Sequence, residues 1–195
     1  MPNSLFQHLM DEVFVYTNRP DLVPETISAL KKATYRAHTV DEFPEDLHTV
    51  QVVPTASPDA SSLLIDVTAA PFVRCRKVTS ISNYPVSVSY QPVGADDLFE
   101  GYGSLKTNIF YKAGLQYVLL AAPQPAQVSV NYLRFPNQDP DTYDSWIAQY
   151  HESAIIEEAA SMVFKAIGKD TEFQRFAQMS AQNYQLLRAS HIIGY

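Results

Sequence analysis

The chain has 195 residues, enough for one domain or for one domain with an elaborate insertion. Apolar residues make up 46% and charged residues 18%, a globular composition that excludes wholesale disorder. The single cysteine excludes an internal disulfide framework and a Cys-rich zinc site. The net charge of −7 and the lack of a basic run argue against sequence-independent binding of nucleic acid. The first residues do not resemble a signal peptide, and no long apolar run indicates a membrane span, so we expect a protein made in a cytoplasm.

Two helices are expected at the start of the chain. Ser4 and Gln7 form a capping-box pattern before an apolar stripe, and Pro20 ends this helix because it disfavours helical geometry at the preceding residue. Asp21 is the expected N-cap of a second helix, which continues to about residue 38. Cations near the C-terminal end of this helix complement its dipole: Lys31, Lys32 and Arg36.

The middle of the chain has a different character, because 8 of the 13 prolines lie within residues 50–138. Short runs of β-forming residues alternate there with turn residues. Seven such runs predict strands at 49–53, 62–67, 72–82, 86–90, 106–111, 116–121 and 127–135. Seven strands are too many for a loop of a helical protein, so we expect an inserted β-sheet or small sandwich.

The last third is expected to be helical again. A short helix over 142–150 and a longer one over 153–167 precede Gly168, a fitting left-handed cap. Asp170 caps a final helix that is expected to end near Ala189. The predicted fold class is α+β, a helical bundle formed by the N- and C-terminal helices with a β-rich insertion in the middle. The predicted division is a helical hairpin at 1–48, the insertion at 49–138, and the C-terminal helices and tail at 139–195.

The sequence shows no pattern that indicates catalysis, a cofactor or a metal. It has 6 glycines, and none forms a phosphate-binding loop. The five histidines lack the i, i+4 spacing of a helical zinc pair. Cys75 lies between basic residues that favour a thiolate, but strand alternation favours an ordinary half-buried cysteine. We therefore predict no catalytic, cofactor-binding or metal-binding residue and no enzymatic activity.

Three groups of acids were weighed as sites for acid–base chemistry or calcium. Asp139 and Asp141 precede a predicted helix, where carboxylates stabilise the N-terminus. Glu157 and Glu158 are adjacent in a helix and therefore point in different directions. The acidic run over residues 96–100 lacks the spacing of an EF-hand. A structural role is favoured for all three groups.

Two parts of the chain resemble phage head-to-tail adaptor proteins. The first 47 residues carry the run Thr17-Asn18-Arg19-Pro20-Asp21-Leu22. The last 65 residues carry Tyr143-Asp144-Ser145-Trp146-Ile147 and Ile167-Gly168-Lys169-Asp170. The resemblance rests on ordered clusters of residues and includes no catalytic signature.

The resemblance implies a structural virion protein of a tailed phage of the short-tailed type, made in the cytoplasm of the host bacterium. Twelve copies would form a ring beneath the portal, extend the DNA channel, and provide a platform for tail nozzle and fibre proteins. Double-stranded DNA would pass without specific binding, because an acidic wall repels phosphates. Cofactors, metals and membranes have no part in this function. Because of its charge, we expect the isolated chain to be monomeric or weakly associated at low salt.

Two other function classes stay open. The 12 tyrosines and 10 phenylalanines suit a tail-associated module that binds protein or carbohydrate. Glutamates and aspartates could also serve a virion-associated peptidoglycan hydrolase.

The C-terminal tail is the expected interface with the portal or a neighbouring subunit. Beyond the predicted helix end, large apolar or aromatic residues remain where chain ends usually fray. Burying one isoleucine side chain stabilises a complex by roughly 1.5–3 kcal/mol. The predicted interface residues are His191, Ile192, Ile193 and Tyr195.

Overall fold

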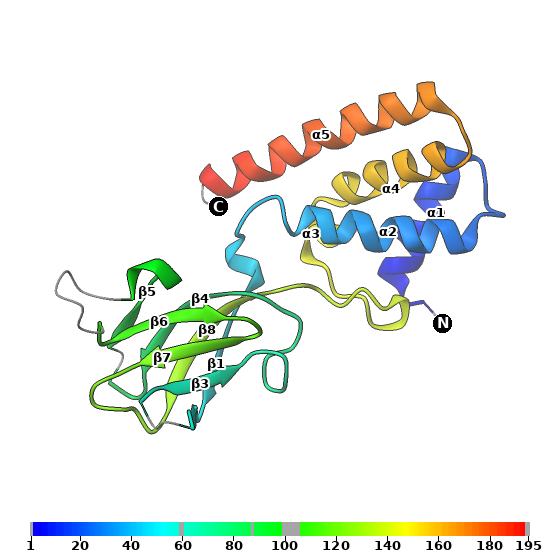
Figure 1. Cartoon of the computed structure of the whole chain (residues 1–195). Coiled ribbons are helices and arrows are strands. Elements are labelled where there is room, and N and C mark those ends of the chain that lie inside the picture. Colours follow the sequence, from blue (N-terminus) through cyan, green and yellow to red (C-terminus); the bar gives the residue numbers. More distant parts are fainter. Residues whose placement is uncertain (1, 59–60, 87, 99–105, 194–195) are drawn as a thin grey trace. The chain divides into compact units, whose positions relative to one another are not determined.

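In the computed structural model, the chain forms two compact units (Figure 1). The helical unit consists of Met1–Asp46 with Phe135–Tyr195, and the sheet unit is Leu47–Arg134. The structure describes residues 2–58, 61–86, 88–98 and 106–193, without the side chains of Ala95 and of residues 191–193.

The helical unit is organised around helix α4. Its helices are α1 (Ser4–Thr17), α2 (Val23–Ala37), α3 (Trp146–Tyr150), α4 (Glu152–Ala166) and α5 (Asp170–Ile193), with short 3-10 helices η1 (Pro44–Asp46) and η3 (Pro140–Thr142). Helix α4 packs against all four of the other α-helices, and residues 154–161 are buried without interruption. A helix that is buried on every side belongs to the interior of a bundle.

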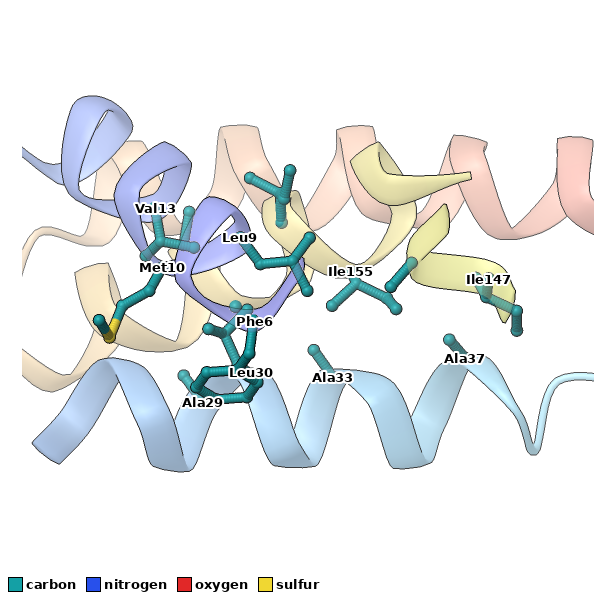
Figure 2. Close-up of a cluster of buried hydrophobic side chains, with 14 of the residues drawn as sticks. Phe6, Leu9, Met10, Val13, Ala29, Leu30, Ala33, Ala37, Ile147 and Ile155 are labelled. Atoms are coloured by element: carbon teal, nitrogen blue, oxygen red, sulfur yellow. The ribbon is translucent and has the colours of Figure 1, made fainter. Parts of the chain in front are cut away.

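Small residues on α2 allow the helices of this unit to approach one another closely. Ala29, Ala33 and Ala37 lie on its buried face, beside Leu30. Figure 2 shows these side chains directed toward Phe6 of α1 and its neighbours. Small side chains on α2 leave room in this core for larger ones from α1, such as Phe6 and Leu9.

The helix ends differ in detail from the expected caps. Asn3, not Ser4, caps α1, because its side-chain Oδ1 accepts the N–H of Phe6 at 2.8 Å. Asp21 does not cap α2 but forms a two-bond ion pair with Arg19. The prediction for Gly168 is confirmed, since its φ of +73° is left-handed, a conformation that favours glycine.

The sheet unit contains one eight-stranded sheet. Its strands are β1 (Leu47–Val52), β2 (Thr55–Ala56), β3 (Leu63–Asp66), β4 (Cys75–Asn83), β5 (Ser89–Pro92), β6 (Ile109–Ala113), β7 (Gln116–Leu120) and β8 (Val128–Arg134). They follow the order β1-β8-β4-β5-β6-β7-β3-β2. Each pairing is antiparallel except that of β5 with β6, which is parallel.

The sheet curls around an apolar core of its own. Alternate residues of β8, namely Val128, Val130 and Tyr132, lie in this core, as strand periodicity requires. The hydroxyl of Tyr117 on β7 accepts the backbone N–H of Val78 on β4 at 3.3 Å. This contact joins strands that are not neighbours in the sheet order, so the inner face is closed on itself.

The predicted fold class is wrong in its emphasis on a helical bundle, although helices from both ends of the chain do share one unit. The fold is α+β, but the eight-stranded curled sheet dominates it, with helices at the two ends of the chain. The physical reason is that the strands bury enough apolar surface among themselves to form a separate core. The runs of β-forming residues indicated strands, but they did not indicate that all of them share one sheet.

The C-terminal helix is longer than expected. Helix α5 continues to Ile193, whereas the sequence predicted its end near Ala189. No helix in the described part of the chain has both the length and the apolar character needed to cross a bilayer.

Because each unit has its own core, we predict that a core substitution in one unit destabilises that unit and leaves the other unchanged. Ile155→Ala removes a fully buried side chain of the helical core and should lower the free energy of unfolding of that unit by about 3 kcal/mol. Hydrogen exchange should then accelerate within residues 2–46 and 135–193 and stay unchanged within the sheet unit. Leu119→Ala should give the reverse pattern, because Leu119 is fully buried in the sheet core.

Val15→Ala is the control for this comparison, because Val15 is 71% exposed and its truncation should change stability by less than about 0.5 kcal/mol. Equal loss of protection in both units from either core variant would contradict the two-core interpretation.

Candidate functional site

The first candidate is a buried polar chain between α2, η1 and α3. The Nδ1 atom of His38 lies 2.9 Å from Oδ1 of Asp46, and its Nε2 atom lies 2.9 Å from Oγ of Ser145. The indole N–H of Trp146 donates to the same carboxylate at 2.9 Å. Since a carboxylate only accepts, His38 donates from Nδ1, and in the neutral form of the imidazole Nε2 accepts the Ser145 hydroxyl. This is the hydrogen-bond order of a Ser–His–Asp triad.

The burial of these three side chains decides whether they can act in catalysis. His38 and Ser145 have 0% exposed surface, and Asp46 has 4%. The Ser145 oxygen also accepts the N–H of Ala148 at 3.2 Å, as the N-cap of α3. A nucleophile must reach its substrate, and a hydroxyl with no exposed surface cannot. The three residues therefore act as a structural clamp that joins the end of α2 to η1 and α3.

The clamp predicts a large difference between two histidine variants. His38→Ala leaves the buried Asp46 carboxylate without its imidazole partner and should lower the free energy of unfolding by about 3 kcal/mol. His8→Ala breaks an exposed pair with Glu152 and should cost less than about 1 kcal/mol. Urea denaturation of both variants measures the difference, and similar losses would contradict the structural role of His38.

A second polar cluster joins α4 to its neighbours. Glu158 forms an ion pair with Arg36 of α2 and accepts the hydroxyl of Ser180 of α5 at 2.8 Å. Glu157 accepts the side-chain amide of Asn183 at 2.6 Å. The adjacent glutamates thus contact different partners, in agreement with the expectation that their side chains point in different directions.

Burial also affects the Glu157 carboxyl. Burial raises its pKa above the ordinary value, and the hydrogen bond from Asn183 offsets part of the rise. Because the folded-state pKa lies above the unfolded one, ionisation opposes folding. The stabilisation that the protonated form provides at low pH is lost as the pH rises through the folded-state pKa.

Glu157→Gln should therefore raise the free energy of unfolding at pH 7, since glutamine keeps an acceptor for Asn183 and carries no charge. The gain should disappear at pH values below about 4, where the unfolded-state carboxyl is protonated as well. Denaturation curves across this pH range test the sign. Glu25→Gln, at an exposed position, is the control and should change stability little at either pH. A less stable Glu157→Gln variant at pH 7 would refute the interpretation.

The third candidate is an open pocket on the surface of the helical unit. It encloses about 630 Å³ between α2 and α4, next to the segment that follows β8. Its lining residues are Lys31, Lys32, Tyr35, Arg36, Gln138, Met162, Lys165 and Ala166. A second pocket of about 330 Å³ shares three of them, Lys32, Met162 and Ala166. We call the two together the basic groove.

The basic groove combines an apolar floor with cations. Met162 and Ala166 supply apolar surface, and four cations come from α2 and α4. Tyr35 is half exposed and stacks on Phe135, with ring centroids 4.6 Å apart. The Arg36 guanidinium is held by Glu158, while Glu25 lines the adjoining pocket. The groove therefore favours a ligand that is both anionic and apolar.

The sequence indicated a helix-dipole role for Lys31, Lys32 and Arg36 and did not indicate a groove. Only Arg36 lies in the last turn of α2, and the two lysines lie nearer its middle. Lys165 joins them only because α4 packs beside α2. His38, Asp46 and Ser145 were missed for the same reason, since about 100 residues separate Ser145 from the other two.

The predicted interface at the C-terminus lies mostly outside the described residues. The backbone of His191, Ile192 and Ile193 continues α5, but their side chains are not described, and Tyr195 is outside altogether. The nearest described anchor is Arg188, which donates to the backbone oxygen of Val40 at 3.0 Å.

The other residues weighed from sequence occupy unremarkable positions. Cys75 is half-buried in β4, and burial raises the pKa of its thiol despite the nearby Lys112. Asp139 accepts the N–H of Asp141 at the start of η3. Asp96 and Asp97 lie in a short 3-10 helix, η2 (Ala95–Asp97), and Glu100 is outside the described residues. Within the described parts, no three His, Cys, Asp or Glu side chains lie together as metal ligands would.

Comparison with known proteins gives no match, either to a family model or to a curated protein.

Proposed function

We propose that the chain is a structural subunit of the head-to-tail adaptor of a tailed phage. In this role, copies of the chain form a ring between the portal and the tail. The ring extends the DNA channel and carries tail proteins, and the mature protein resides in the neck of the virion. It performs no catalysis and needs no cofactor.

The observation that supports the proposal most directly is the composition of the helical unit. The resemblance covers the first 47 and the last 65 residues, and the helical unit is built from 1–46 and 135–195. Two segments at opposite ends of the chain thus contribute to one core, in which α4 packs against both α1 and α2. The helical unit is accordingly the part expected to bear the function shared with adaptors.

The buried clamp favours a structural role over hydrolysis. A peptidoglycan hydrolase needs carboxylates that reach a polysaccharide, and the Asp46 carboxylate is enclosed by its partners. A zymogram tests this alternative, and lysis by the purified chain would favour it.

The sheet unit supplies a surface for tail proteins. Three apolar side chains near the β4–β5 connection are 42–67% exposed: Tyr84, Val86 and Val88. Exposed apolar residues that lie close together mark contact sites for other proteins. The same feature suits a tail-associated binding module, which would bind tail proteins but would not bind the portal.

Co-sedimentation with portal rings of the same phage distinguishes these functions. An adaptor should pellet with the portal and appear in electron micrographs as a ring on one end of it. A binding module should stay in the supernatant, and that result would overturn the proposal.

The predicted C-terminal interface gives a sharper form of this test. Deletion of His191–Tyr195 should leave the thermal midpoint nearly unchanged and weaken attachment to the portal at least tenfold. Leu186→Asp is the control, because it alters an exposed apolar side chain of the same helix without removing the last turn. If the deletion variant melts well below the parent or binds the portal equally well, the tail is not the interface.

A further inference from the structure

The charges of the helical unit are unevenly distributed. The unit contains 16 acids and 8 Lys or Arg residues, a net charge of −8. Half of its cations line the basic groove: Lys31, Lys32, Arg36 and Lys165. An acidic unit with half of its cations gathered in one groove is more positive there than its net charge implies.

Helix α1 provides the acidic counterpart. Its sequence contains Asp11 and Glu12 and has no Lys or Arg. Asp11 is exposed, and Val15, one turn further along the same face, is 71% exposed. His8, also on this face, pairs with Glu152, which adds a third carboxylate. We call these residues the α1 face.

The exposed groove residues of α2 do not lie on the side of that helix that packs toward α1. The buried side of α2 carries Ala29, Leu30 and Ala33 and is directed toward α1 (Figure 2). Lys32 and Tyr35 lie on its exposed side. Lys32 and Tyr35 of the groove therefore face away from the side of α2 that is directed toward α1.

We propose that the basic groove binds the α1 face of a second copy of this chain. The lysines would pair with Asp11 and Glu12, and Val15 would lie against the apolar floor formed by Met162 and Ala166. This is recognition of an amphipathic helix in a groove, with complementary charge at the rim. Because two different surfaces meet, the contact is heterologous, and repetition of it produces a ring when the rotation closes.

The inference deepens the proposed function, because a ring of adaptors needs a contact of this type. It is compatible with weak association of the isolated chain, since the net charge of each copy opposes the contact. At 0.15 M salt the Debye length is about 8 Å, so distant charges are screened while paired charges at the contact still attract.

Sedimentation velocity at 0.15 M salt, from about 10 µM to about 1 mM protein, provides the test. The wild-type sedimentation coefficient should rise with concentration. Lys32→Glu with Lys165→Glu should weaken association at least tenfold. Asp11→Lys with Glu12→Lys should weaken it equally, although this variant carries less net charge and repels its copies less. An equimolar mixture of the two double variants should associate again, because the glutamates in the groove of one variant can pair with the lysines on the α1 face of the other.

The matched control is Lys77→Glu with Lys112→Glu. It makes the same change in net charge as the groove variant, at two exposed positions of the sheet unit. This control should associate like the wild type.

Three results would overturn the inference: wild-type protein that stays monomeric at every concentration, equal loss in the control, or a mixture that does not recover. A monomeric chain that still forms a ring on the portal would overturn this contact but leave the proposed function standing. Association through the groove by a chain that does not bind the portal would support this contact and overturn the proposed function.

Discussion

The antiparallel pairing of β1 with β8 is the constraint on which the helical unit depends. The strands that come first and last along the chain, β1 and β8, are neighbours in the sheet. Six residue pairs join them, from Leu47 with Leu133 to Val52 with Val128. The chain therefore leaves the helical unit after Asp46 and returns at Phe135 from adjacent points. Closing a flexible loop of the 88 residues between them would cost about 4 kcal/mol in chain entropy. The folded sheet removes most of this cost, so α1 and α2 can share a core with α3, α4 and α5.

The residues at the two ends of this connection are fixed within the helical unit. Asp46 is bound by His38 and Trp146, and Phe135 stacks on Tyr35. A buried carboxylate is costly to desolvate, and an apolar replacement often gives similar stability. The polar clamp restricts the relative orientation of α2, η1 and α3, because hydrogen bonds are directional. The clamp thus resembles a catalytic triad in connectivity while it serves to position the point where the chain leaves the bundle.

The sequence predicted the local structure well and the long-range structure poorly. Seven β-rich runs correspond to seven of the eight strands, and the exception, β2, has two residues and no detectable periodicity. Hydrophobic spacing fixes which face of a strand is buried, but it does not fix which strands pair, so the sequence left a single sheet and a small sandwich both open. The same limit applies to the sites. His38 and Ser145 are unremarkable in sequence and become partners only through the packing of α2 against α3.

Charge shows most clearly how the fold changes what the sequence implies. Summed over the chain, a charge of −7 predicts that copies repel one another. In the fold, however, the charges are unevenly distributed. The small residues of α2 occupy its buried side, and Lys32 lies on its exposed side. Packing of α4 then brings Lys165 to the same groove. Under the proposed contact, long-range repulsion would keep isolated copies apart, while local complementarity would select the orientation in which they attract. A subunit of this kind suits assembly on a template, since a partner that raises the local concentration of copies overcomes the repulsion and leaves the orientation to the groove.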